Sequence, residues 1–278
     1  MISCIAILYL AAFAPSGVNA LAVNSQLSNS QLPTRVLKHS AWELGVGRWA
    51  LGVAEFEERQ ASDPDALYAQ RQDLASARRA ADIWASRLQA NGGDFEAAWK
   101  LARARFWLGG HAPEKERKPF LEAGVAAGRV AAALQPNRPE GHFWAAANMG
   151  ALAESFGLRQ GLKYRGDIRD GLMTVLKLDA AFQQGSADRA LGRWYLKVPG
   201  LFGGSKKKSE EHLRKSLTYN PNSSSSLFFL AETLIALNRK DEARAALHKL
   251  LEAPADPDWA PEDREFKERG RRLIATLR

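Results

Sequence analysis

Hydrophobic residues recur at every third or fourth position along most of the chain from residue 63 onward. This spacing places them on one face of a helix, and short breaks rich in Gly, Pro or Asn separate one such segment from the next. No segment shows the alternation of apolar and polar residues that is typical of a strand. The pattern therefore predicts an all-α protein built from consecutive helices.

The predicted helices pair into hairpins. The first hairpin, over residues 67–91, consists of a short helix and a helix over 78–88. In the second hairpin residues 95–108 pair with 120–134, and in the third residues 142–154 pair with 168–178. Residues 109–114 form a polar insert in the second pair. In the third pair, the glycine-bounded basic segment 157–166 predicts a bend, which is either a partner surface or a solvated linker.

A constant repeat length identifies the type of hairpin. Leu213 and Leu217 recur as Leu247 and Leu251 at one and the same offset. That offset equals the period of a tetratricopeptide hairpin, which is about 34 residues. Other positions of the motif are filled by Leu191, Gly192, Tyr195, Ser209, Pro221, Ala231 and Ala243. The small residues let two antiparallel helices approach closely. Residues 63–257 are thus predicted to form a tetratricopeptide-like α-α superhelix, a solenoid.

Two further segments complete the array. Residues 258–278 carry Phe266, Leu273, Ile274 and Leu277 on one helical face and are predicted to form a C-terminal capping helix, which shields the last stacking face. Within the repeat, residues 197–204 are an apolar insertion. That insertion either folds back on the core or forms a binding lip.

Residues 1–62 differ in character from the repeat. Residues 2–14 are an uncharged apolar run, and residues 18–20 supply the small side chains that a signal peptidase needs, so residues 1–20 are predicted to be a secretory signal, cleaved or retained as an anchor. Residues 21–62 are predicted to be a polar tether with a candidate docking helix, in which Trp42, Val46, Trp49 and Val53 follow helical spacing. The chain is therefore expected to be periplasmic or otherwise exported.

Stacked hairpins curve, and the first helix of each pair lines the concave face. Aligning the repeats predicts a groove whose ligand- or partner-binding residues are Lys100, Trp107, Trp144, Asn148, Arg189, Arg193, Phe228 and Glu232. Aromatic walls and two arginines suit an acidic peptide or a small ligand with an apolar body and a carboxylate, which arginine grips with two parallel hydrogen bonds. In the alternative interpretation, Arg193 pairs with Glu232 across adjacent helices and only holds the stack together.

Charge and candidate chemistry narrow the function. The net charge of +8 indicates nucleic acid, anionic lipid or acidic partners, or simply a solvated basic surface, and no nucleic-acid-binding motif accompanies it. The single cysteine, Cys4, excludes an internal disulfide, and the five histidines do not follow metal-binding spacing. We predict no metal site, no cofactor and no catalytic site.

Residues 138–166, 190–204 and 206–222 resemble the T component of tripartite ATP-independent periplasmic (TRAP) transporters, the TatT-like family, and the likeness extends over roughly residues 63–270. The resemblance implies a periplasmic protein that associates with the solute-binding subunit and binds a hydrophobic or organic-acid ligand. The chain departs from that family in having no lipidation cysteine after its apolar leader.

The stretch over residues 191–204 also resembles the eukaryotic regulators of microtubule dynamics, which share the repeat, although the bacterial-style leader favours the first resemblance. The sequence thus predicts a non-catalytic exported scaffold of a TRAP-type transporter. The alternative is a general protein-protein interaction scaffold in the bacterial envelope.

Overall fold

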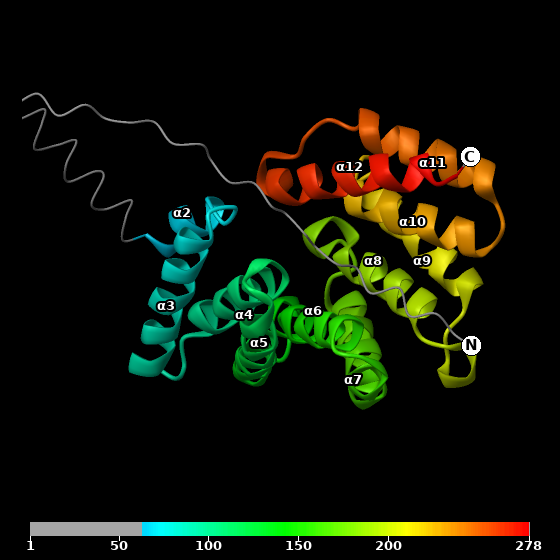
Figure 1. Ribbon diagram of the computed structural model, residues 1–278. Helices are drawn as coiled ribbons and strands as arrows, with labels where there is room; N and C mark the ends of the chain where they lie inside the picture. The colour runs from blue at the N-terminus through cyan, green and yellow to red at the C-terminus, as the bar shows by residue number, and fades with distance from the viewer. Residues whose placement is uncertain (1–62, 278) are drawn as a thin grey trace, which may run out of the picture. The chain divides into compact units, whose positions relative to one another are not determined.

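The computed structural model describes residues 63–277, and within this range every regular element is a helix (Figure 1). Eleven α-helices follow one another here, together with two short 3-10 helices, η1 (Gly200–Phe202) and η2 (Pro257–Trp259). The α-helices are α2 (Pro64–Ala69), α3 (Leu74–Ala90), α4 (Phe95–His111), α5 (Glu114–Leu134), α6 (Pro139–Ser155), α7 (Leu158–Leu178), α8 (Phe182–Lys197), α9 (Lys206–Tyr219), α10 (Ser224–Ala236), α11 (Lys240–Glu252) and α12 (Ala260–Ala275).

The hairpins stack as a tetratricopeptide solenoid, which confirms the predicted fold class. Helices α9 and α11 begin at Lys206 and Lys240, one tetratricopeptide period apart, as the repeat requires. The earlier hairpins are longer, since α5 and α7 each have 21 residues whereas α11 has 13. The first helices pack on one another in the order α4, α6, α8, α10, and α12 continues this row by packing on α10 and α11. Figure 1 shows this succession from α4 to α12.

Short polar side chains set where several helices begin. Asp63, Asp73 and Asp94 accept hydrogen bonds from backbone N–H groups in the first turns of α2, α3 and α4, and Ser205 and Ser223 do the same for α9 and α10. Such capping satisfies donors that a helix start leaves without an intrahelical partner. These starts are therefore determined locally by the sequence.

Two predicted interruptions are wrong. Residues 157–166 do not form a bend, because α7 begins at Leu158, and the polar insert at 109–114 shrinks to two residues between α4 and α5. The reason in α7 is its buried stripe, in which Tyr164, Ile168, Leu172 and Val175 recur at helical spacing and pack in the core. That burial outweighs the helix-weakening effect of Gly161 and Gly166.

Helices α5 and α6 approach so closely that only glycine fits at the contact. A Cβ atom added at Gly141 would lie 2.3 Å from the backbone nitrogen of Ala132, and one added at Gly128 would lie 2.6 Å from that of Ala145. This close packing sets the angle at which one hairpin follows the next, and with it the curvature of the solenoid.

The predicted signal, tether and docking helix lie outside the described residues. No helix between residues 63 and 277 is both long enough and apolar enough to cross a membrane.

Candidate binding groove

The inner face of the solenoid is hollowed into a groove with a volume of about 1100 Å³. Helices α4, α6, α7, α8, α10 and α12 and the loop before α12 contribute to its wall. Most of the wall is apolar and includes Phe106, Phe143, Trp144, Leu162, Ile168, Trp194, Phe229 and Phe266. The space is large enough for an elongated ligand, and its composition is typical of a binding site.

Contacts between the two ends of the array close one side of the groove. Arg71, in the turn after α2, donates two hydrogen bonds to the carboxylate of Glu262 in α12, at 2.9 and 2.5 Å, and one to the carbonyl oxygen of Asp258 at 2.9 Å. Nearby, His111 Nε2 lies 2.6 Å from the carboxylate of Glu265. We call these two pairs the end-to-end latch. It turns an open trough into a partly enclosed cavity.

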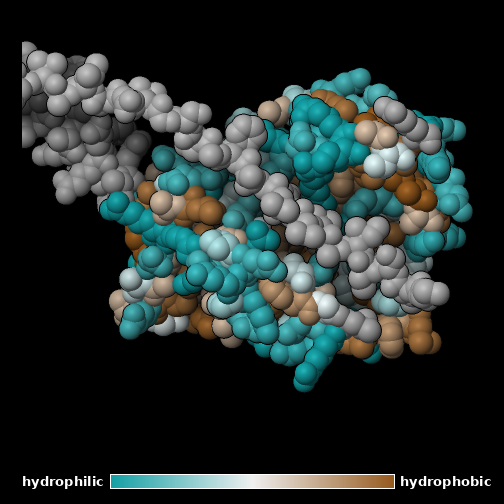
Figure 2. Space-filling view, in the orientation of Figure 1, coloured by the Kyte–Doolittle hydropathy of each residue, from teal (hydrophilic) through white to brown (hydrophobic). Residues whose placement is uncertain are grey.

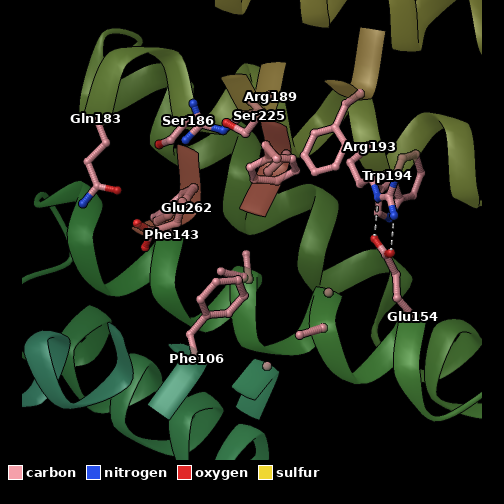
Figure 3. A pocket seen from close by; sticks show the side chains of 18 of the residues that line it. Phe106, Phe143, Glu154, Gln183, Ser186, Arg189, Arg193, Trp194, Ser225 and Glu262 are labelled. Atoms are coloured by element: carbon pink, nitrogen blue, oxygen red, sulfur yellow. Dashed lines mark hydrogen bonds and ion pairs between the residues drawn. The ribbon is translucent and has the colours of Figure 1, made fainter. Parts of the chain in front are cut away.

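An unusual turn sets the polar side of the groove. Gln183, Gln184 and Gly185, in the first turn of α8, adopt positive φ values of 45°, 58° and 74°. This conformation is costly for a side chain other than glycine and often marks a functional site. The turn brings Gln183, Ser186 and Arg189 into the groove wall, where Figure 3 shows them. The Oε1 atom of Gln183 is buried and accepts no hydrogen bond from the described residues.

Arg189 is a cation without a partner in the described part of the chain. Its guanidinium lines the groove, and among residues 63–277 it makes no hydrogen bond or ion pair. Burial lowers its pKa to about 10, and Glu262 offsets this only in part by acting from a distance. The side chain is still charged at neutral pH. It therefore carries a desolvation cost that an anionic ligand would relieve.

Arg193, one turn further along α8, has a different role. It donates two hydrogen bonds to Glu154 of α6, at 2.9 and 2.7 Å, and a third to Glu232 of α10. Its guanidinium also lies 4.6 Å from the centre of the Phe229 ring. Desolvation acts to lower its pKa, but the two carboxylates raise it above the ordinary value. Arg193 thus joins the inner helices of three successive hairpins.

Comparison with protein families supplies the context. Residues 61–207 match the family described as Regulator of microtubule dynamics protein 1-3, and this match spans more than half of the 278 residues. The chain belongs to this family. The adjoining residues 207–261 match a tetratricopeptide repeat family, so the family match ends where a regular repeat begins. No significant match is found among curated proteins.

A comparison with solved structures concerns the fold of this family member. A thermophilic tetratricopeptide protein from Thermus thermophilus, TTC0263, superposes with a TM-score of 0.58 at 21% identity, covering 77% of this chain and 99% of its own. MamA is also similar, with a TM-score of 0.44 and 14% identity, over 72% of this chain and 95% of its own. The match with TTC0263 shows a shared helical-repeat fold.

The groove contains half of the residues predicted from the sequence of this family member. Trp107, Trp144, Arg189 and Arg193 line it. Lys100 instead pairs with Asp65 at 2.7 Å, and Glu232 is held by Arg193. Asn148 and Phe228 do not line the groove, which corrects the predicted lining.

Both corrections have a packing cause. Asn148 is fully buried, and its amide donates to the carbonyl oxygens of Ala102 and Trp144, at 3.0 and 2.8 Å, in the space that the missing side chain of Gly124 leaves. Phe228 packs edge-on against Phe229 and tilted against Phe266 in the C-terminal core.

Sequence reasoning missed Phe106, Gln183, Ser186 and Glu262, all of which line the groove. Phe106 was one position outside the predicted stripe, and no local signal marks the left-handed turn at Gln183. For the insertion at 197–204 the sequence allows two roles, packing on the core or forming a binding lip. Its Val198 and Pro199 line the groove, whereas Leu201 is exposed to solvent. No cluster of metal-ligating side chains occurs in the described residues.

Proposed function

We propose that this protein is a non-catalytic scaffold whose groove binds one elongated ligand that has an apolar body and an anionic end. The observation that carries the proposal is the Arg189 guanidinium, which faces an apolar groove and has no partner within residues 63–277. Removing the charge of an arginine from water without a partner costs desolvation free energy. This cost is explained if a carboxylate or a similar anion completes the site.

The polar groups around Arg189 support this assignment. Gln183 lies in the left-handed turn and Ser186 directly after it, and Ser225 comes from the start of α10, as Figure 3 shows. The Ser225 hydroxyl and the Gln183 carboxamide can add hydrogen bonds to an anion held by the guanidinium, whereas the buried Ser186 hydroxyl already donates to the carbonyl oxygen of Phe182 at 3.0 Å. On the opposite side, Phe106 and Phe143 offer aromatic surface to an apolar body.

A second candidate is an acidic segment of a protein partner. The tetratricopeptide match supports it, because such repeats are protein-interaction scaffolds. The exposed Asn222 lines the groove and adds a carboxamide that would suit the backbone of an extended peptide. Both candidates place the anionic group at Arg189.

We further propose, as the finer form of either candidate, that the protein is exported and that its partner is the solute-binding subunit of a TRAP-type transporter. This step rests on the resemblance of residues 138–166, 190–204 and 206–222 and on the apolar leader. Membership in the family described as Regulator of microtubule dynamics protein 1-3 gives the proposed export and TRAP-type partner no further support. The broader scaffold in the bacterial envelope is the alternative.

Calorimetry with decanoate and with decylammonium, its cationic counterpart of equal length, tests the groove. The full chain should bind decanoate and not decylammonium. Arg189→Met should weaken decanoate binding about tenfold to a hundredfold, because a hydrogen-bonded charge pair contributes roughly 1.5–3 kcal/mol. Arg129→Met is the matched control, since Arg129 is exposed and bound to Asp167 outside the groove.

The hexapeptide acetyl-LFLFEE separates the second candidate from the first. Binding of the peptide that requires Arg189, without binding of decanoate, would assign the groove to a protein partner. If Arg189→Met bound both probes as tightly as the unaltered chain does, the anion subsite would be wrong.

A further inference from the structure

The loop between α8 and α9 presents apolar side chains to solvent. Leu201 in η1 is 89% exposed and Phe202 is 37% exposed. Figure 2 shows apolar surface at the lower right edge of the molecule, where Figure 1 places this loop. One exposed leucine is ordinary on a protein surface. The exposure of Leu201 becomes informative because of the residues that surround it.

The loop is held in a defined conformation. The N–H groups of Phe202 and Gly204 donate to the carbonyl oxygen of Pro199, at 2.8 and 3.2 Å, and that of Ser205 donates to Tyr195 at 2.9 Å. A Cβ atom added at Gly204 would lie 1.7 Å from the carbonyl oxygen of Val198. The turn thus presents Leu201 at a fixed tip while its other side lines the groove.

Two basic segments without acidic residues meet at this tip. Residues 194–209 contain four lysines, residues 155–166 contain three lysines and arginines, and neither segment contains Asp or Glu. The segments touch, because Trp194 Nε1 donates to the carbonyl oxygen of Arg165 at 3.1 Å and the Arg165 guanidinium lies 5.4 Å from the centre of the Phe202 ring. Positive charge is therefore concentrated around an apolar tip.

Most of these cations face solvent, and the acidic residues that flank them are engaged. The exposed ones are Arg159, Lys163, Lys197, Lys206, Lys207 and Lys208. Glu154 is bound by Arg193, Asp167 by Arg129, Asp188 by His212, and Glu210 by Arg214 and Arg239. Glu211, which is exposed, follows one turn further along α9. The field at the tip is accordingly positive.

We propose that Leu201, Phe202 and the lysines at 206–208, which we call the basic lip, dock on an anionic membrane surface. Leucine and phenylalanine side chains enter the headgroup region, and lysines gain from the negative surface potential. A convex apolar tip fits a fluid interface that can close around it. An acidic protein surface would match the charge but would need a preformed pocket for Leu201.

Vesicle sedimentation with the full chain tests the basic lip. Binding should be at least about tenfold tighter on phosphatidylcholine vesicles containing phosphatidylserine than on phosphatidylcholine alone. Lys207→Glu/Lys208→Glu should reduce that binding about tenfold or more, and Leu201→Ser about threefold to tenfold. Lys115→Glu/Lys118→Glu on α5 is the matched control and should have little effect, because it changes the net charge equally at another surface.

The variants distinguish the lip from other routes to the membrane. Binding through the apolar residues 2–14 would be as strong on neutral vesicles and would survive every lip substitution, which would overturn the proposal. Vesicle binding could also respond to the lysine substitutions but not to Leu201→Ser. If poly-glutamate then competed with the vesicles equally well for the protein, the lip would be assigned to an acidic macromolecule instead.

Insertion of the tip has its own readout. The NBD fluorophore attached to Leu201→Cys, in a Cys4→Ser background, should brighten several-fold on vesicles that contain phosphatidylserine. The same label on Lys115→Cys should stay dim, since α5 remains in water. Equal brightness at the two positions would contradict insertion through the loop.

Discussion

Replacing Arg193 by methionine should lower the stability of the protein, whereas replacing Arg189 by methionine should raise it. Arg193 is 16% exposed, and its partners Glu154 and Glu232 are 39% and 23% exposed. Removing one member of a buried ion pair typically costs about 3–5 kcal/mol because the remaining charge stays desolvated. Water screens Glu154 in part, so we expect Arg193→Met to destabilise the fold by about 2–3 kcal/mol.

Arg189→Met removes a charge that lacks such partners. Burial lowers the pKa of Arg189 from its ordinary value to about 10. Since one pKa unit corresponds to about 1.4 kcal/mol, holding the cation in the groove costs at most about 3 kcal/mol at neutral pH. The side chain is only half-buried, so we expect the variant to gain about 1–2 kcal/mol.

Thermal unfolding followed by circular dichroism at pH 7 measures both effects. For a domain of this size, 1 kcal/mol shifts Tm by roughly 2–4 °C. Arg193→Met should then lower Tm by about 4–12 °C, and Arg189→Met should raise it by about 2–8 °C. Arg129→Met, at an exposed ion pair, should change Tm by less than about 2 °C. If both groove variants shifted Tm the same way, the different roles assigned to the two arginines would be wrong.

Two further predictions concern packing and pH. Gly141→Ala should lower the free energy of unfolding by about 1–3 kcal/mol because its Cβ would meet the Ala132 backbone at 2.3 Å. Gly166→Ala, in α7 with open space around it, should instead raise the free energy of unfolding by about 1 kcal/mol. Denaturant titration measures both variants, and equal effects would show that the close approach at Gly141 is wrong. Although desolvation lowers the pKa of His111, its contact with Glu265 raises it overall, so the stabilising contribution is complete below the unfolded pKa of about 6.5 and is lost as pH rises through the folded value. The Tm difference between the unaltered chain and His111→Gln should therefore shrink from pH 5 to pH 9, and a difference that grew with pH would contradict the latch.

The fold was predictable because its determinants are local. The repetition of Leu213 as Leu247 reports a hairpin that buries the same face each time, and no distant residue is needed to recognise it. The same helical spacing assigned Trp107, Trp144, Arg189 and Arg193 to the inner face, where all four line the groove, while their part in binding stays a prediction. In α7 the glycines predict a bend, but the stripe from Tyr164 to Val175 decides the structure, because burial of such a stripe contributes more than the glycines cost.

The rest of the groove depends on features that no short segment carries. Gln183 and Gln184 adopt left-handed conformations without being glycine or asparagine, so the turn has no compositional signal. Arg71 and Glu262 are far apart in the sequence and meet only because small rotations between hairpins accumulate along the solenoid. A repeat period predicts each hairpin, but errors in the angle between hairpins add up over the array.

The end-to-end latch also explains why Arg189 lacks a partner within the described residues. Arg71 is buried against the rings of Tyr68 and Trp107 and holds the carboxylate of Glu262 through two hydrogen bonds. Glu262 still lowers the electrostatic cost of Arg189 from a distance but does not neutralise it. The contact that encloses the groove is therefore the same one that leaves Arg189 without a direct ion pair within residues 63–277, as the proposed anion subsite requires.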